Sequence, residues 1–144
     1  MPDKMKKNLL NFEHNCRKAG LRVTPQRAAV YEVLKKSTQH PSAETVFQEV
    51  RKMLPNISLD TVNRTLLTFQ RVGLAFVVEG SGDPKRFDAN FKNHQHFRCV
   101  KCRRIIDFHY RKFDNIKLPP SLAKKFKILR KTVYVEGICD GCLD

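Results

Sequence analysis

Two Cys-x-x-Cys pairs are the strongest chemical signal in this sequence. Cys99 and Cys102 form the first pair and Cys139 and Cys142 the second, with 36 residues between them. Two intervening residues allow both sulfurs of a pair to face one tetrahedral ion at about 2.3 Å. In an intracellular chain such pairs indicate zinc rather than disulfides, and four thiolates predict a structural site; a redox dithiol is the alternative. Cys16 lies in a helical pattern and is expected to be a small, partly buried hydrophobe rather than a reactive group.

A second group of possible ligands precedes and surrounds the first cysteine pair. His94 and His96 are separated by one residue in a segment that is expected to be extended, which places both rings on one side. Asp88 and Asp107 lie near them in the sequence. Nitrogen and oxygen ligands suit Fe(II), Mn(II) or Zn(II) rather than a soft ion. The histidines could also be ordinary surface residues, and spacing alone does not connect His40 to them.

The first half of the chain has the pattern of helices. Thr24, Ser42 and Ser58 each precede a run with helical periodicity and are predicted to be N-caps. In the last of these helices we expect Leu59, Val62, Leu66 and Phe69 to face inward. The predicted helices cover residues 5–19, 25–34, 43–50 and 59–72.

A hairpin is predicted directly after the helices. Ala75 to Glu79 is apolar and β-prone, Gly80 to Pro84 are turn formers, and Lys85 to Phe87 form a basic return strand. Three helices followed by a short hairpin are typical of a winged helix-turn-helix, whose second motif helix enters the major groove of DNA.

On this interpretation the helix that begins after Ser58 reads DNA. Asn63 could bond to an adenine, and Arg64 could bond to a guanine edge or to a phosphate. The alternative is an ordinary solvated helix face. Further candidates for DNA contact are Thr61, Thr68, Arg22, Gln26 and Arg27.

The second half of the chain is predicted to be mainly strands. Short β-prone runs flank the first cysteine pair, a helical stretch is expected from Pro119 to about Lys125, and a β-branched run from Lys127 leads to Cys139. The predicted fold class is therefore α+β. A winged-helix domain would occupy residues 1–89, and a small metal-binding domain would occupy residues 90–144.

The charge of the chain favours a polyanionic partner. The chain has 28 Lys and Arg against 14 Asp and Glu, a formal charge of +14, and both halves are basic. Such a balance is most often associated with nucleic acid, although a solvated basic surface is the alternative. No run approaches the roughly 20 apolar residues of a membrane span, and the first residues lack the apolar core of a signal peptide. A cytoplasmic location and no membrane partner are expected.

In combination, these motifs resemble the ferric uptake regulator (Fur) family of metal-dependent repressors. The resemblance spans nearly the whole chain. It implies a homodimer with an N-terminal winged-helix domain that binds a double-stranded DNA operator and a C-terminal dimerisation domain. The matching segments are GLRVTPQRAAV (20–30), HPSAETVF (40–47), ISLDTVNRTL (57–66), KRFD (85–88), HQHFRCVKC (94–102), IID (105–107) and GICDGC (137–142).

The resemblance also implies two metal sites. The four paired cysteines match the ligands of a structural Zn(2+). A regulatory site for Fe(2+) or Mn(2+) matches His40, Asp88, His94, His96 and Asp107. A metal bonded to His40 and to the second domain would fix the angle between domains and thus the spacing of the reading helices.

Two aspartates at positions 88 and 107 resemble the peroxide-sensing branch of the family. There Fe(II) reacts with hydrogen peroxide and a histidine ligand is oxidised, by analogy His40 or His94. An iron, manganese or zinc uptake regulator is the alternative within the family. A second metal site of iron sensors is expected to be absent, because its positions hold Asn93, Gln95 and Lys131.

Three residues depart from the family pattern. Asn63 replaces a usual tyrosine, Asp60 a common alanine and Arg103 a common glycine after the second cysteine. The operator and the turn after Cys102 could therefore differ from the usual ones.

Two functions of other classes are weaker alternatives. A metal-dependent hydrolase could use His94, His96 and Asp107, but no general base or substrate pocket is evident, so we do not expect an enzyme. A zinc protein that binds nucleic acid without sequence preference would show no effect of the exchangeable metal.

Overall fold

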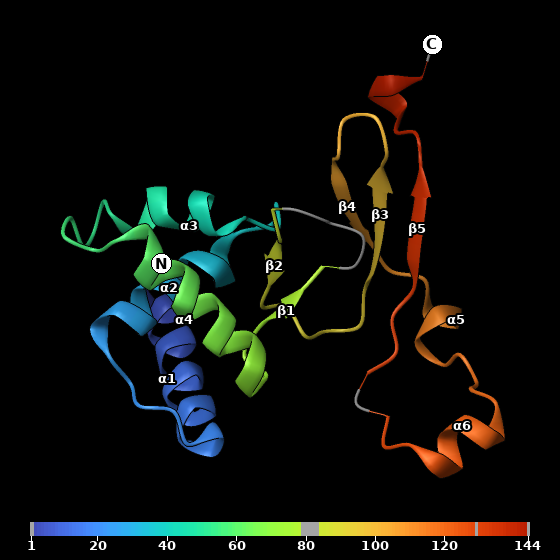
Figure 1. Ribbon diagram of the computed structural model, residues 1–144, viewed down its shortest axis with the longest axis horizontal. Helices are drawn as coiled ribbons and strands as arrows, with labels where there is room; N and C mark the ends of the chain where they lie inside the picture. The colour runs from blue at the N-terminus through green and yellow to red at the C-terminus, as the bar shows by residue number, and fades with distance from the viewer. Residues whose placement is uncertain (1, 79–83, 129, 144) are drawn as a thin grey trace. The chain divides into compact units, whose positions relative to one another are not determined.

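The chain forms two compact units, residues 1–90 and residues 91–144 (Figure 1). The computed structural model describes residues 2–78, 84–128 and 130–143. The boundary between the units lies one residue from the predicted one. Most of the predicted turn before Lys85 lies outside the described residues.

The first unit consists of four helices and a short hairpin. Thr24, Ser42 and Ser58 each accept a hydrogen bond from the N–H three residues later, at 3.1, 3.3 and 3.1 Å, so the predicted N-caps form. Gly73 ends the last helix with a φ of 83°, which glycine adopts without strain. The helices are α1 (Pro2–Ala19), α2 (Pro25–Lys36), α3 (Ala43–Val50) and α4 (Leu59–Val72).

An aromatic cluster forms the centre of this unit. The rings of Phe12, Tyr31 and Phe69 lie 4.8 to 6.1 Å apart, and all three side chains are buried. Cys16, predicted to be a partly buried hydrophobe, is fully buried, and burial raises the pKa of its thiol. The prediction that Leu59 faces inward is wrong. Leu59 is 44% exposed, because the buried face of α4 carries Val62, Thr65, Leu66 and Phe69 instead.

The hairpin pairs β1 (Phe76–Val77) with β2 (Phe87–Asp88) in antiparallel register. An isolated bridge between Ser42 and Arg86 joins the residues before α3 to the residues before β2. The helices and hairpin together give the arrangement of a winged helix, in which α4 is the second helix of the predicted helix-turn-helix motif.

The second unit contains a three-stranded sheet. Its central strand β3 (Gln95–Cys99) pairs antiparallel with β4 (Ile105–Phe108) and parallel with β5 (Tyr134–Gly137). Three short helices complete this unit: α5 (Arg111–Asp114), α6 (Pro120–Lys125) and the 3-10 turn η1 (Asp140–Cys142). The predicted α+β class is confirmed. Within the described ranges, no helix is long and apolar enough to cross a membrane.

Candidate metal centres and nucleic-acid interface

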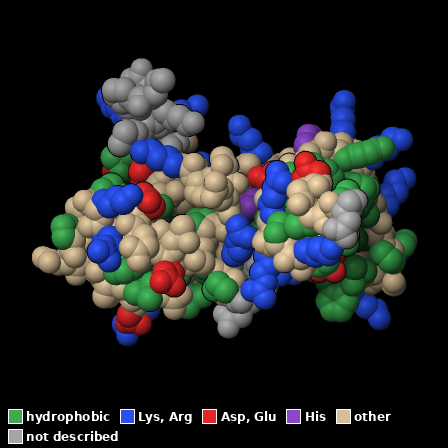
Figure 2. Space-filling model, turned by 90° about the horizontal axis from the view of Figure 1, so that it is seen from above, with side chains coloured by type: hydrophobic (Ala, Val, Ile, Leu, Met, Phe, Trp, Pro, Cys, Tyr) green, Lys and Arg blue, Asp and Glu red, His purple; other side chains and the backbone are tan. Residues whose placement is uncertain are grey.

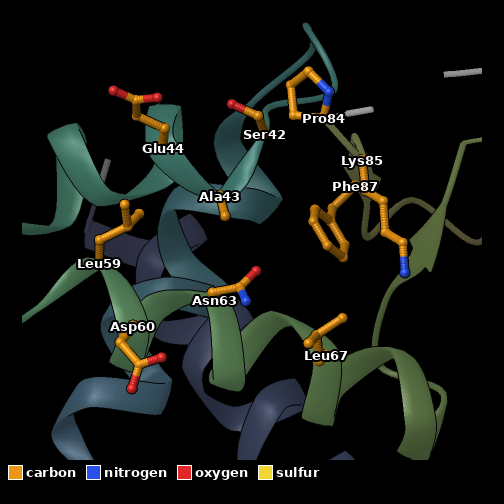
Figure 3. A pocket seen from close by; sticks show the side chains of 10 residues that line it. All are labelled: Ser42, Ala43, Glu44, Leu59, Asp60, Asn63, Leu67, Pro84, Lys85 and Phe87. Atoms are coloured by element: carbon orange, nitrogen blue, oxygen red, sulfur yellow. The ribbon is translucent and has the colours of Figure 1, made fainter. Parts of the chain in front are cut away.

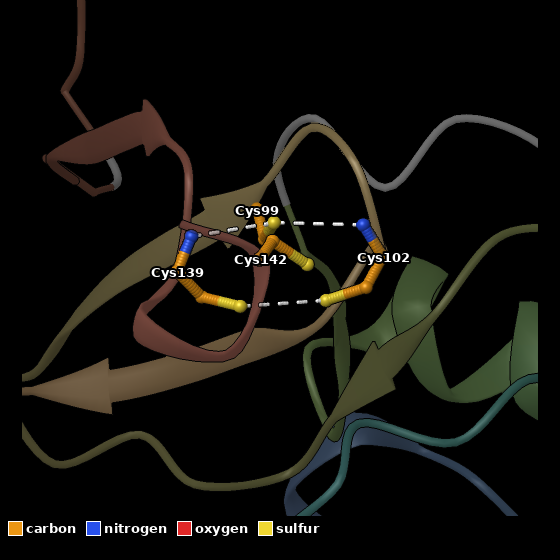
Figure 4. A group of neighbouring side chains, drawn as sticks. All are labelled: Cys99, Cys102, Cys139 and Cys142. Carbon is orange, nitrogen blue, oxygen red and sulfur yellow. Dashed lines mark hydrogen bonds between the residues drawn. The ribbon is translucent and has the colours of Figure 1, made fainter. Parts of the chain in front are cut away.

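The four paired cysteines meet in the second unit (Figure 4). All four sulfurs lie within 4.8 Å of one another, and the sulfurs of Cys102 and Cys139 are 3.7 Å apart. A tetrahedral ion with bonds of about 2.3 Å to sulfur requires sulfur–sulfur distances of about 3.8 Å. The residues therefore fit a zinc ion with no open coordination position.

Strand pairing brings the two cysteine pairs together. Cys99 ends β3, Cys102 lies in the turn between β3 and β4, and the second pair follows β5. Cys99 is the register partner of Gly137, and the N–H of Val100 donates to the carbonyl of Gly137 at 2.9 Å. Parallel pairing of β3 with β5 therefore places Cys139 beside the first pair, across a long sequence separation.

Hydrogen bonds favour the thiolate form of one cysteine. The backbone N–H groups of Cys102 and Cys139 donate to Cys99 Sγ at 3.5 and 3.4 Å, and they lower the pKa of Cys99 to about 6. The neighbouring sulfurs of Cys139 and Cys102 raise the pKa of Cys142 to about 12. Four adjacent thiols cannot all ionise without a nearby positive charge, which a dication supplies.

Arg103, directly after the first pair, has a strained backbone. Its φ is 64°, in the left-handed region that favours glycine. We predict that Arg103→Gly raises the free energy of unfolding of the zinc-loaded protein by about 1 kcal/mol. The substitution removes the cost of the left-handed conformation, but part of this gain is lost because glycine is more flexible in the unfolded chain. Thermal unfolding tests this. The control is Lys101→Gly, in the same turn but at a residue without positive φ, which should not raise the stability of the protein. A lower stability of Arg103→Gly than of the wild type would contradict the explanation.

The first unit holds a buried His–Asp pair. His40 lies between α2 and α3, is 3% exposed and has a φ of 52°. Its Nδ1 is 3.3 Å from Asp88 Oδ2 on β2, while Asp88 Oδ1 accepts from the N–H of Asn90 at 2.7 Å. Two ligand atoms bonded to one ion at 2.0–2.2 Å are about 2.8–3.6 Å apart, for ligand angles between a right angle and the tetrahedral angle. The pair therefore fits two ligands of one metal, and its backbone strain is of a kind found at functional sites.

The second unit holds a corresponding pair on neighbouring strands. His96 on β3 and Asp107 on β4 are register partners, with Nε2 and Oδ1 3.3 Å apart. The ring of His94 lies 4.7 Å from that of His96, and its Nδ1 is 2.6 Å from the carbonyl of Lys92. When Nδ1 donates to a carbonyl, Nε2 is the nitrogen that can bind a metal.

The positions of the second family metal site carry a polar network. Gln95 donates to Asp114 at 3.0 Å and accepts from the N–H of Tyr110 at 2.8 Å. His109 Nε2 lies 2.6 Å from the other Asp114 oxygen and lowers the pKa of that carboxyl. Lys131 donates to the carbonyl of Ile116 at 2.9 Å. These side chains thus bond to one another and to the backbone.

A pocket of about 590 Å³ separates α4 from the start of β2 (Figure 3). Figure 3 shows the Asn63 side chain pointing from α4 into this pocket, with Phe87 on the opposite side. The Asn63 amide is shorter than the tyrosine that the family resemblance gives for this position, so the pocket is more open than a tyrosine would leave it. The other lining residues are Ser42, Ala43, Glu44, Leu59, Asp60, Leu67, Pro84 and Lys85.

The remaining DNA-contact candidates differ in how their polar groups are used. Thr61 accepts a hydrogen bond from the Ser58 hydroxyl at 2.9 Å, so its side chain belongs to the helix cap. Arg27 donates to the carbonyl of Arg22 at 2.7 Å. Arg22 and Gln26 are exposed and Thr68 is half-buried. On the face in Figure 2, Lys and Arg side chains are spread widely rather than gathered in one patch.

Asp60 pairs with Arg64 on the exposed face of α4, at 3.0 Å. We predict that Asp60→Ala increases DNA affinity about 3- to 10-fold at low salt. The substitution removes a negative charge that repels phosphate, and it releases the Arg64 guanidinium to contact a phosphate. The plot of log affinity against log salt concentration should therefore become steeper by about the slope of one phosphate contact. Fluorescence anisotropy over a range of salt concentrations, with a duplex selected by the wild-type protein, measures both quantities.

Glu44→Ala is the control for the Asp60 experiment, since it removes an acidic side chain lining the same pocket. It should have a smaller effect and leave the salt slope unchanged. Weaker binding by Asp60→Ala with an unchanged slope would show that Arg64 does not contact phosphate.

Comparison with known proteins agrees with this geometry. The sequence model of the Ferric uptake regulator family matches residues 18–136. The chain belongs to this family. Members of this family are metal-dependent transcriptional repressors, which agrees with the four-cysteine cluster and the two His–Asp pairs. The predictions of a Fur-family regulator and of a protein that is not an enzyme are confirmed.

Individual members give a finer comparison. The peroxide-responsive repressor PerR of Staphylococcus epidermidis is 35% identical over 126 residues, covering 88% of this chain and 84% of that protein. The ferric uptake regulator of Helicobacter pylori, whose structure has three functional metal-binding sites, superposes with a TM-score of 0.74 at 25% identity, covering 96% and 93% of the two chains. The Campylobacter jejuni peroxide stress regulator superposes with a TM-score of 0.65 at 27% identity, covering 93% and 98%.

Proposed function

We propose that this chain is a peroxide-responsive repressor that binds a double-stranded DNA operator as a cytoplasmic homodimer when its regulatory site holds Fe(II) or Mn(II). The observation that carries the proposal is the set of donors. The four-cysteine site takes zinc, and each unit separately presents a His–Asp pair of harder ligands, with aspartate at both acidic positions. Relatives about one third identical are named peroxide-responsive repressors.

A single regulatory ion would take ligands from both units. Iron and manganese bind more donor atoms than one His–Asp pair offers. The first unit would supply two ligands, His40 and Asp88, and the second unit three, His94, His96 and Asp107. Three neutral imidazoles and two carboxylates together balance the charge of a dication. Because His40 and Asp88 belong to the unit that contains α4, their bonds would couple the metal to the position of the reading helix. In a dimer that position sets the half-site spacing.

Fe(II) held by these residues would supply the redox chemistry that activates hydrogen peroxide. In the net reaction the ring of His40 or His94 would lose two electrons and gain one oxygen atom from the peroxide, and the other oxygen atom would leave as water. An oxidised ring is a poorer ligand, so its unit is released from the metal and repression ends. Mn(II) would support DNA binding without this reaction.

Operator binding tests the proposal. The affinity of the zinc-containing protein for its operator is measured at fixed salt without regulatory metal, with Mn(II) and with Fe(II), before and after dilute peroxide. We expect both metals to strengthen binding and peroxide to abolish it only for the Fe(II) form. Metal activation without any peroxide effect would identify an uptake regulator of the same family. Equal affinity in every state would exclude both.

Mass spectrometry identifies the oxidised residue. After peroxide, the Fe(II) protein should carry one added oxygen atom on the peptide containing His40 or His94, and the Mn(II) protein should not. Oxygen added only to cysteine would indicate thiol sensing instead.

A further inference from the structure

Arg86 holds the loop that carries His40. Its Nε donates to the carbonyl of His40 at 2.7 Å, and a second guanidinium nitrogen donates to the carbonyl of Gln39. The N–H of Phe87 donates to the carbonyl of Pro41 at 3.0 Å, beside the bridge between Arg86 and Ser42. The backbone carbonyls of three successive residues before α3 therefore accept hydrogen bonds from Arg86, directly before β2, and from Phe87, its first residue.

This attachment counteracts an unfavourable backbone conformation. His40 has a φ of 52°, a left-handed conformation that residues with a Cβ atom rarely adopt. Such a conformation persists only when surrounding bonds hold it. Bonds from a guanidinium to carbonyl groups are charge-assisted, and the rigid fork of arginine can reach two neighbouring carbonyls at once.

The neighbouring cation on the same segment has a different environment. Lys85 is exposed and lines the pocket beside α4, whereas Arg86 is half-buried with its guanidinium on the backbone of the loop. The predicted basic return strand of the wing thus has one cation toward solvent and one bonded within the unit.

We propose that Arg86 is a positioning residue of the regulatory metal site, which rests on the proposed function of His40. The segment Arg86–Asp88 carries one ligand, Asp88, and the side chain that holds the other, His40. Arg86 holds the backbone of the His40 loop in the conformation in which His40 Nδ1 lies 3.3 Å from Asp88 Oδ2. Its loss leaves both ligands in the chain but removes their preorganisation.

Mn(II) affinity of single and double variants tests this role. In the zinc-containing protein, Arg86→Ala should raise the Mn(II) Kd about 10- to 100-fold, the effect typical of groups that orient metal ligands. Arg86→Lys, which keeps the charge but not the fork, should fall between Arg86→Ala and the wild type. The control Lys85→Ala removes an adjacent charge and should change the Kd less than about twofold.

A double-variant cycle separates positioning from a general loss of stability. If Arg86 acts through His40, adding Arg86→Ala to His40→Ala should change the Mn(II) Kd by less than about twofold. An effect of similar size in both backgrounds would overturn the proposal. If His40→Ala itself leaves the Kd unchanged, the proposed function of His40 fails; if it weakens binding while Arg86→Ala does not, only the positioning role fails.

A readout without metal completes the test. The ring C–H signal of His40 in the NMR spectrum, identified by its absence from His40→Ala, should move toward the position of an exposed histidine in metal-free Arg86→Ala. The same signal should stay in place in Lys85→Ala. An unchanged His40 signal in Arg86→Ala would show that the guanidinium does not position the ring.

Discussion

Replacing His40 by alanine is expected to abolish metal-dependent DNA binding while zinc content and fold are retained. His40 is a buried ligand candidate in the unit that contains α4. Its loss should weaken Mn(II) binding by about 100-fold or more, because even groups that only orient a ligand contribute 10- to 100-fold. The measurement is the operator affinity of protein that holds one zinc per chain and is free of excess zinc, with and without Mn(II).

The matched control is His14→Ala, which removes an exposed histidine of α1 in the same unit. It should bind Mn(II) and operator as the wild type does. If His40→Ala kept full activation by Mn(II), the metal would not act through the DNA-binding unit.

Replacing Cys99 by serine should have the largest effect on folding. We expect the variant to lose its zinc and the second unit to unfold, while the first unit stays folded. Structural zinc contributes on the order of 10 kcal/mol to small domains. Among the described residues of the second unit, the buried hydrophobic side chains are Cys99, Ile105 and Cys139, so two of the three are metal ligands. The remaining apolar burial in one chain is too small to replace the metal.

Two measurements check the Cys99 prediction. Plasma mass spectrometry should find one zinc per wild-type chain and none in Cys99→Ser, and hydrogen exchange should become fast in β3, β4 and β5 but not in α2 or α4. Cys16→Ala is the control, since Cys16 is buried in the other unit. Full zinc content and a protected sheet in Cys99→Ser would contradict a structural role for the ion.

Local signals predicted much of the first unit. N-caps such as Ser42 and Ser58 act over three residues, so the sequence is enough to locate where a helix begins. The inward position of Leu59 was wrong because the first turn of a helix is not obliged to continue the buried stripe. The second unit was harder to predict. Helix α5 has four residues, and β5 covers only Tyr134–Gly137 of a longer β-prone run, since pairing with β3 rather than propensity limits it.

Long-range contacts explain what the sequence could not predict about the sites. The Cys-x-x-Cys spacing is a local signal and predicted the cysteine cluster. No spacing relates His40 to Asp88, because the hydrogen bonds of Arg86 and the bridge to Ser42 bring them together. The left-handed backbone of His40 also follows from surrounding contacts and was not predicted, whereas at Arg103 the glycine common in the resembled family was a signal for such a turn.

A crystal structure of the Mn(II)-loaded, zinc-containing protein, with anomalous scattering recorded at the manganese edge, tests the central claim most directly. The account predicts one manganese peak per chain, bonded to His40 and Asp88 and also to His94, His96 and Asp107. A manganese ion bonded only to ligands of the second unit, with His40 directed away from it, would contradict the account.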